Sequence, residues 1–319
     1  MTATIPPPAV GGAHVATNAA RGHRGSGRLA ARRSRVGLLF VLPAMTLVVV
    51  LFVIPTIYTI ALSFFESSLL GDLTFIGLAN FERALADPAL VQALLFTTLY
   101  TVVVTAVLFV IGMALALMVS GAIGRAAAAL RTIVVVPVVI GFATASYIAL
   151  WLLDGRIGIV NRALDDTGLV DAPISWFGSF GTAFAVVIVL VVWKTVGLTM
   201  LLLMSGMNAI PGDLYEAAQL DGAGWWRRLF SITLPLLRPT IALVLILTVI
   251  SSYLAFDQFF ILTQGGPDRS TVTFVYLIYR AGFIDFDLGY SAALSVILMG
   301  ILLLLTAVQF RVLRQDGDR

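Results

Sequence analysis

The chain has 319 residues, of which 60% are hydrophobic and only 12% are charged, and its mean hydropathy is +1.01. A soluble domain carries about 25% charged residues, so this apolar excess predicts an integral membrane protein. The chain has no cysteine, and its two histidines, His14 and His23, lie near the N-terminus. We therefore expect no catalytic residue, no metal site and no disulfide in the body of the protein.

The first 35 residues are rich in Pro, Gly, Ala and Arg and show no apolar periodicity, which predicts a disordered basic tail. Six apolar segments follow, each close to or above the length of about 20 residues that crosses a bilayer. They lie near residues 36–65, 93–120, 131–153, 182–208, 240–263 and 289–311. The sequence thus predicts an all-α integral membrane protein with about six transmembrane helices in a transmembrane domain, 36–314, and a short tail, 315–319.

The distribution of arginine predicts the orientation, because cytoplasmic loops of membrane proteins are enriched in Lys and Arg. Cations gather in the N-terminal tail, after the second and sixth segments and between the fourth and fifth, whereas the remaining loops are acidic. These cations include Arg33, Arg125, Arg131, Arg227, Arg228, Arg238, Arg311 and Arg314. We expect both termini to be cytoplasmic. Contact with anionic lipid explains the basic pI of about 9.4 better than nucleic-acid binding does.

The predicted cytoplasmic loop at 209–239 has the pattern of a helix, a tight turn and a second helix. Asp213 precedes Glu216 by three residues, which is the spacing of a capping box, so capping alone would explain Glu216. Gly222 is placed to end the first helix in a left-handed conformation. Apolar residues on an exposed helix beside a membrane suggest that the loop docks onto a partner protein.

The same loop carries the pattern Glu-Ala-Ala, three residues, Gly, nine residues, Ile, one residue, Leu-Pro. The matching positions are Glu216, Ala217, Ala218, Gly222, Ile232, Leu234 and Pro235, with Asp221 and Ala223 extending the match. This resembles the signature loop of permeases in binding-protein-dependent ABC importers, in the form found in carbohydrate uptake. The segments 263–267 and 289–294 resemble the maltose and glycerol-phosphate permease branch, and the resemblance spans residues 36–314.

The resemblance implies a subunit of the bacterial inner membrane that forms the path for a sugar or oligosaccharide delivered by an extracytoplasmic binding protein. It also implies a second homologous permease and two ATPase subunits, which bind ATP and Mg, with the Glu216–Ala223 segment coupling the chain to the ATPase. The residues agree with this division, because a phosphate loop needs a lysine after spaced glycines. The only lysine, Lys194, has no such glycine before it. We expect no cofactor in this chain and no enzymatic activity of its own.

Two ionisable residues lie within the predicted spans, Lys194 in the fourth and Asp257 in the fifth. Intramembrane charges usually face a partner or a wet cavity, so both are candidates for the solute path, and Tyr253 and Phe256 are candidates for stacking on a sugar. The alternatives are an ion pair between Lys194 and Asp257, snorkelling of the lysine, and ordinary packing of the aromatic rings.

The solute itself is less constrained by the sequence. A phosphate group would favour several cations around the cavity, and Lys194 is the one cation within the spans, which favours a neutral sugar. Glycerol phosphate or a glycerophosphodiester remains an alternative. A secondary transporter is the alternative class, although such proteins usually show internal repeats and more intramembrane carboxylates.

Overall fold

The computed structural model describes residues 40–67, 73–120, 124–168, 170 and 172–315, and the predicted tail at 1–35 lies outside these ranges. The chain divides into two compact units, Met1–Tyr58 and Thr59–Arg319. The described part of the first unit belongs to an apolar helix over Phe40–Leu62, with η1 at Val49–Val53 and α2 at Ile54–Leu62. Its side chains are almost all apolar, as expected for a helix that lies in lipid.

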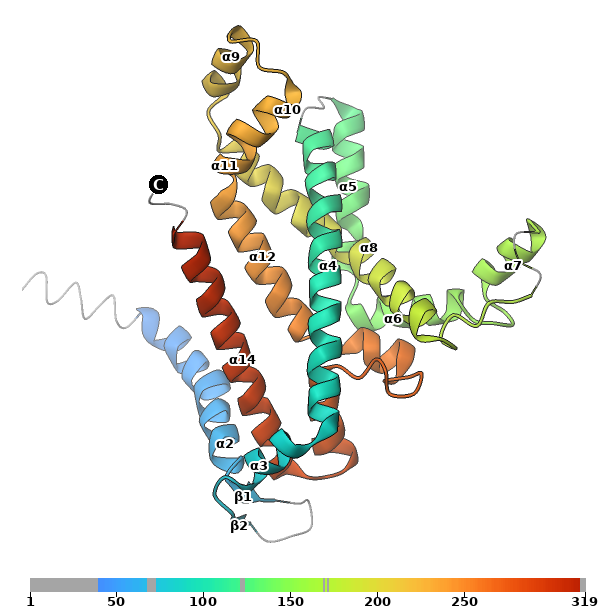
Figure 1. Cartoon of the computed structure of the whole chain (residues 1–319), viewed down its shortest axis with the longest axis vertical. Helices are drawn as coiled ribbons and strands as arrows, with labels where there is room; N and C mark the ends of the chain where they lie inside the picture. Colours follow the sequence, from blue (N-terminus) through green and yellow to red (C-terminus); the bar gives the residue numbers. More distant parts are fainter. Residues whose placement is uncertain (1–39, 68–72, 121–123, 169, 171, 316–319) are drawn as a thin grey trace, which may run out of the picture. The chain divides into compact units, whose positions relative to one another are not determined.

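The second unit is almost entirely helical (Figure 1). A hairpin of two short strands, β1 at Phe65–Glu66 and β2 at Thr74–Phe75, pairs Phe65 with Phe75. This hairpin departs from the all-α expectation. The helices are α3 Ala79–Ala86, α4 Pro88–Ser120, α5 Arg125–Val139, α6 Phe142–Leu152, α7 Ile159–Asp166, α8 Phe180–Asn208, α9 Gly212–Leu220, α10 Trp225–Arg228, η2 Leu229–Thr233, α11 Leu234–Leu236, α12 Arg238–Tyr253, η3 Phe259–Thr263, α13 Phe274–Tyr279, η4 Arg280–Ile284 and α14 Leu288–Gln315.

Four helices of the described chain are long and apolar enough to cross a membrane: Phe40–Leu62, Pro88–Ser120, Phe180–Asn208 and Leu288–Arg311. Two further segments qualify only as bent pairs, Arg125–Val139 with Phe142–Leu152 at 98° and Trp225–Leu236 with Arg238–Tyr253 at 68°. The protein is therefore a helical, multi-pass membrane protein with four to six candidate spans. The apolar pattern of the sequence shows neither bend.

Close helix packing around α8 depends on two glycines. A Cβ on Gly197 would lie 2.3 Å from the carbonyl oxygen of Val134 in α5, and one on Gly112 in α4 would lie 2.5 Å from Thr199 Cγ2 in α8. Small residues let helices in membranes approach to this distance. The absence of side chains at these two positions therefore brings α4 and α5 against α8, which forms the core of the second unit.

Capping residues mark where several helices begin. Asp87 Oδ1 accepts a hydrogen bond from the N–H of Ala89 at 2.8 Å, next to Pro88 at the first position of α4, where proline is favoured. Asp287 Oδ1 accepts one from the N–H of Tyr290 at 3.1 Å in α14. Side-chain acceptors satisfy N–H groups that the first turn of a helix leaves free.

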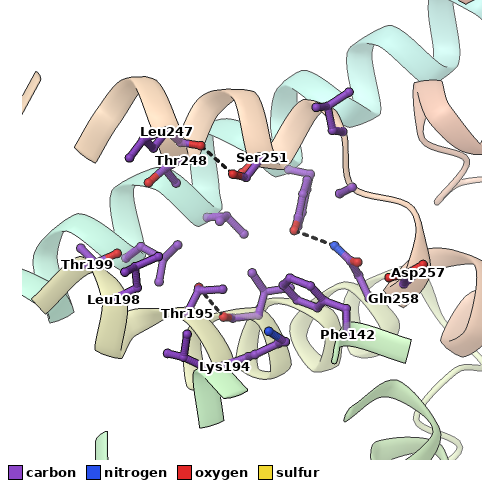
Figure 2. Close-up of a pocket in the computed structure, with 18 of the residues that line it drawn as sticks. Phe142, Lys194, Thr195, Leu198, Thr199, Leu247, Thr248, Ser251, Asp257 and Gln258 are labelled. Carbon is purple, nitrogen blue, oxygen red and sulfur yellow. Dashed lines mark hydrogen bonds between the residues drawn. The ribbon is translucent and has the colours of Figure 1, made fainter. Parts of the chain in front are cut away.

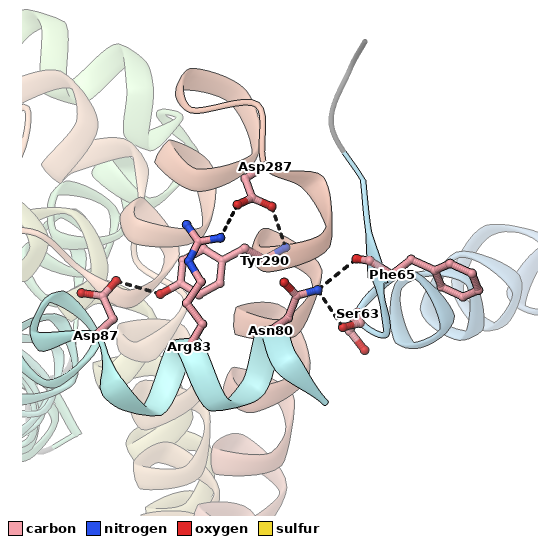
Figure 3. A network of polar contacts seen from close by, with 7 residues as sticks. All are labelled: Ser63, Phe65, Asn80, Arg83, Asp87, Asp287 and Tyr290. Atoms are coloured by element: carbon pink, nitrogen blue, oxygen red, sulfur yellow. Dashed lines mark hydrogen bonds and ion pairs between the residues drawn. The ribbon is translucent and has the colours of Figure 1, made fainter. Parts of the chain in front are cut away.

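The same two aspartates join α3 to the start of α14 (Figure 3). Arg83 in α3 pairs with Asp287 at 2.5 Å, and Tyr290 donates to Asp87 at 2.8 Å. The hydrogen bond to Asp287 raises the pKa of Arg83 above its ordinary value. Asn80, also in α3, donates to the carbonyl oxygens of Ser63 and Phe65. The short helix α3 therefore links the beginnings of α4 and α14 to the hairpin.

Candidate functional site

A cavity of about 420 Å³ lies among α4, α6, α8 and the end of α12 (Figure 2). It exists because α12 stops at Tyr253, and Leu254–Phe256 are not helical before the chain turns into η3. The carbonyl of Ala255 in this break accepts a hydrogen bond from Thr273 Oγ1 at 3.1 Å. Non-helical backbone at membrane depth is tolerated where protein satisfies it or where it lines a wet cavity, and discontinuous helices of this kind form solute sites in transporters.

Three of the hydroxyl groups that line this cavity on α8 and α12 donate to their own helices. Thr195 Oγ1 donates to the carbonyl of Val191 at 2.6 Å. Thr248 donates to its own helix at 2.8 Å, and Ser251 does so at 2.7 Å. A hydroxyl that donates to its own backbone has only lone pairs left to offer. The walls are therefore rich in hydrogen-bond acceptors.

Lys194 supplies the one positively charged group of the cavity lining. The residue is 7% exposed, and its Nζ lies 4.2 Å from the centroid of the Phe142 ring in a cation–π contact. Asp257 lines the same cavity and is exposed at its rim. The ion pairs found among the described residues are Arg83–Asp287 and Arg280–Asp285, so Lys194 and Asp257 share the cavity without pairing.

Two residues of the lining were missed by sequence reasoning. Gln258 Nε2 donates to the hydroxyl of Tyr100 in α4 at 3.1 Å, and both side chains are buried, at 3% and 1% exposure. Loss of either partner would leave the other buried without a hydrogen bond, which is costly. The bond joins α4 to the break that follows α12. The signal in the sequence was one amide beside Asp257, which alone carries little weight.

The aromatic candidates occupy different places. Phe256 lines the cavity and stacks on Phe260 with centroids 5.1 Å apart. Its ring is also 5.1 Å from that of Tyr279. Tyr253 instead lies 2.8 Å by its hydroxyl from Thr98 Oγ1 and is buried with Phe274 in a core cluster. The structure thus brings Phe256, Lys194 and Asp257 to one cavity and leaves Tyr253 behind its wall.

The loop before α12 contains the Glu-Ala-Ala segment on helix α9. Gly222 has a φ of +75°. The N–H of Ala223 bonds the carbonyl of Ala218 at 2.8 Å, and that of Gly222 bonds Gln219 at 3.0 Å. This is the Schellman pattern of a helix end, so the predicted left-handed role of Gly222 is confirmed.

The predicted capping box is wrong. Helix α9 begins at Gly212 with Pro211 as its N-cap, and no side chain caps it. Proline at the cap fixes the backbone as the helix begins, which moves Asp213 into the first turn, where it cannot take the cap position. The Glu216 side chain, exposed on α9, is consequently free of the capping role and available to an external partner.

The remaining residues of the segment form a small exposed surface. Ala217, Asp221 and Gly222 are exposed, and Ala218 and Ala223 are half-buried. Helix α9 is held to the next helix by a contact of 3.0 Å between the hydroxyls of Tyr215 and Thr233. The surface therefore stands on a helix whose position is tied to the chain entering α12.

Comparison with protein families agrees with this geometry. Residues 109–315 match the family of binding-protein-dependent transport system inner membrane components. This chain belongs to that family of ABC importer permeases, which decides against the secondary-transporter alternative.

Curated relatives cover nearly the whole chain. It is 34% identical to the sulfoquinovosyl glycerol transport system permease protein SmoG of Agrobacterium fabrum, over 88% of this chain and 90% of the relative. It is 34% identical to the sn-glycerol-3-phosphate transport system permease protein UgpA of the same organism, over 86% and 92%. It is 30% identical to the trehalose/maltose transport system permease protein MalF of Thermococcus litoralis, over 91% and 98%.

A solved structure shares the fold. A chain of a bacterial ABC transporter involved in the import of the acidic polysaccharide alginate superposes with a TM-score of 0.79, covering 90% of this chain and 99% of that one at 22% identity. The two chains thus share their overall fold.

Proposed function

We propose that this chain, with a second homologous permease, forms the translocation path for a sugar or oligosaccharide delivered by an extracytoplasmic binding protein. The observation that carries this proposal is the acceptor-rich cavity at the break after α12. Sugar hydroxyls are donors, and Thr195, Thr248 and Ser251 offer lone pairs, while the Asp257 carboxylate accepts hydrogen bonds from two hydroxyls at once. The half-buried Phe256 ring supplies an apolar face beside them.

The alternative solute is a glycerol phosphate or a glycerophosphodiester, and a specific observation favours it. Lys194 has no carboxylate within ion-pair distance in the described chain, so its charge is free to meet an anion. Against this, the lining also contains Asp257 and many acceptors, which repel a phosphate. The balance of donors and acceptors favours the neutral sugar.

The coupling part of the proposal concerns α9. Its exposed Glu216–Ala223 surface fits a docking site for a separate ATPase subunit, which binds ATP and Mg and transmits its closure to α8 and α12 as a rigid-body movement. Two such subunits serve the pair of permeases, and this chain hydrolyses no ATP itself. The arginine distribution supports cytoplasmic termini in the bacterial inner membrane, and reporter fusions at Arg319 and near Asp166 should report opposite sides.

The function is tested by uptake into proteoliposomes that contain the full complex, with the binding protein supplied outside. We expect ATP-dependent uptake of labelled sugars and none of sn-glycerol 3-phosphate. Uptake of sn-glycerol 3-phosphate without uptake of any sugar would show that the solute is the glycerol phosphate and not a sugar. ATP hydrolysis by the purified chain without its partners would contradict the division of labour.

A further inference from the structure

The helix over Trp225–Leu236, made of α10, η2 and α11, has an aromatic edge that the rest of the described chain leaves uncovered. Trp225, Trp226 and Phe230 are 50%, 66% and 61% exposed. The two indole rings meet edge to face with centroids 4.6 Å apart, and Trp226 stacks on Phe230 at 6.0 Å. Three large rings held against one another in this way form a rigid apolar surface that water solvates poorly.

Other side chains of the same helix point into the protein. Leu229 and Thr233 are buried, and Thr233 contacts the hydroxyl of Tyr215 in α9 at 3.0 Å. One side of the helix is therefore buried and touches α9 through Thr233, whereas a second, apolar side is exposed.

The direction of the helix brings the open edge toward a membrane surface. Trp225–Leu236 runs at 68° to α12. The 16 residues of α12 rise about 24 Å, and the crossing continues through η3, whose Phe259, Ile261 and Leu262 are buried. The helix Trp225–Leu236 is thus not required to cross the hydrocarbon core, and where α12 runs along the membrane normal the bend of 68° places this helix nearer to the membrane plane than to the normal.

The charges within this helix and directly after it are of one sign, whereas the neighbouring α9 carries Asp213, Glu216 and Asp221. Arg227 and Arg228 lie within the helix, Arg238 follows it, and no acidic residue occurs between Gly222 and Phe256. Tryptophan is enriched at the boundary between lipid and water, and each basic residue near an anionic membrane surface is attracted to it. Aromatic rings together with arginines and without carboxylates are the composition of an interfacial helix.

We propose that Trp225–Leu236 is an interfacial anchor, which inserts Trp226 and Phe230 at the headgroup boundary on the coupling-loop side and binds anionic lipid through Arg227. Because Thr233 of this anchor contacts Tyr215 of α9, the lipid surface sets the height at which α9 meets its partner. The anchor is independent of which solute the cavity accepts.

The absence of cysteine from the chain allows a direct test. Phe230→Cys carries a spin label, and the full complex is reconstituted in phosphatidylcholine vesicles with or without phosphatidylglycerol. The wild-type chain, treated alike, gives the background from partner subunits. Collision of the label with oxygen, which partitions into lipid, is compared with collision with a water-soluble nickel complex. Asp166→Cys, exposed at the end of α7 and outside the docking surface of α9, is the matched control.

We expect the oxygen-to-nickel ratio at position 230 to be several-fold higher than at 166, and to rise further with phosphatidylglycerol unless Arg227→Gln is also present. Equal nickel access at 230 and 166 would show that the edge faces water and would overturn the proposal. Exclusion of both reagents at 230 would show a protein partner on the edge and would overturn it as well. An oxygen-to-nickel ratio that does not change with phosphatidylglycerol would contradict the proposal that Arg227 binds anionic lipid. Trp226→Cys replaces Phe230→Cys if the latter does not assemble.

Discussion

The two ends of α12 were shaped by different kinds of interaction. Before Arg238, the Glu-Ala-Ala helix ends through bonds between residues three to five apart, such as Ala223 to Ala218. After Tyr253, the cavity is assembled by contacts across the chain, such as Gln258 to Tyr100. The first end is encoded in consecutive residues, and the second depends on how helices meet. Substitutions at the two ends should therefore fail in different ways.

The largest expected effect is at the coupling end. Gly222 has a φ of +75° and open space around its Cα, so Gly222→Asp costs roughly 1 kcal/mol through the backbone and leaves the fold intact. Glu216→Ala removes an exposed charge, which at a buried docking contact is worth about 2–5 kcal/mol. We expect both variants to reach the membrane and to lose most uptake, measured together with co-purification of the ATPase.

Gln219→Ala is the control for these variants, because Gln219 is exposed on the same helix. It should transport and bind the ATPase as the wild type does. Normal uptake by both Glu216→Ala and Gly222→Asp would show that the loop only connects α8 to α12 and does not couple the chain to the ATPase.

The second largest effect is expected where α8 packs closely against α5. Gly197→Ala places a Cβ 2.3 Å from the Val134 carbonyl, and overpacking of this kind costs about 1–3 kcal/mol. Gly181→Ala, on the same helix but with nothing within 4 Å, should be neutral or slightly stabilising, since alanine is the better helix former. Thermal unfolding of the two purified variants checks the difference, and equal melting temperatures would contradict close packing at Gly197.

These two ends also show how far sequence reasoning reached. The apolar segments and the turn at Gly222 followed from local patterns, because a span needs length and a left-handed turn needs glycine. The capping box failed because Pro211 took the cap position instead of Asp213. The bend of 98° after Val139 has a local signal in Pro137, near the end of α5, because proline kinks or ends a helix. The polar pair of Tyr100 and Gln258 left no local signature, since it depends on which helices come together. Lys194 and Asp257 were found because charge within a span is rare.

A smaller effect is expected at the cavity from Lys194→Met, which keeps the length of the apolar stem. A hydrogen bond to a charged group contributes about 1.5–3 kcal/mol, so the maximal uptake rate should fall about tenfold, which corresponds to about 1.4 kcal/mol. The concentration for half-maximal uptake should change little, because the binding protein captures the solute. Assembly should be normal, since no carboxylate is stranded.

An ion pair formed in the working transporter would give another pattern. Lys194→Met would then lower the amount of assembled complex, and adding Asp257→Ala would restore it. Wild-type uptake by Lys194→Met would remove the lysine from the path.

The smallest effect is expected from Tyr100→Phe, which tests the cavity wall alone. The ring of Tyr100 packs edge to face on Phe259 at 4.9 Å, and phenylalanine keeps this contact while removing the acceptor of Gln258. A buried donor left without a partner costs about 1–3 kcal/mol, so the melting temperature should fall by a few degrees.

Tyr147→Phe in α6 is the control, because Tyr147 is 61% exposed and loses no buried bond. A Tyr100→Phe protein as stable as Tyr147→Phe would mean that Gln258 finds another acceptor. The cavity lining offers such acceptors in Thr195, Thr248 and Ser251, and a Gln258 amide turned toward them would replace sugar hydroxyls as their donor. In that case uptake should fall although stability does not, so measuring both quantities separates a structural bond from one that keeps the acceptors open for the solute.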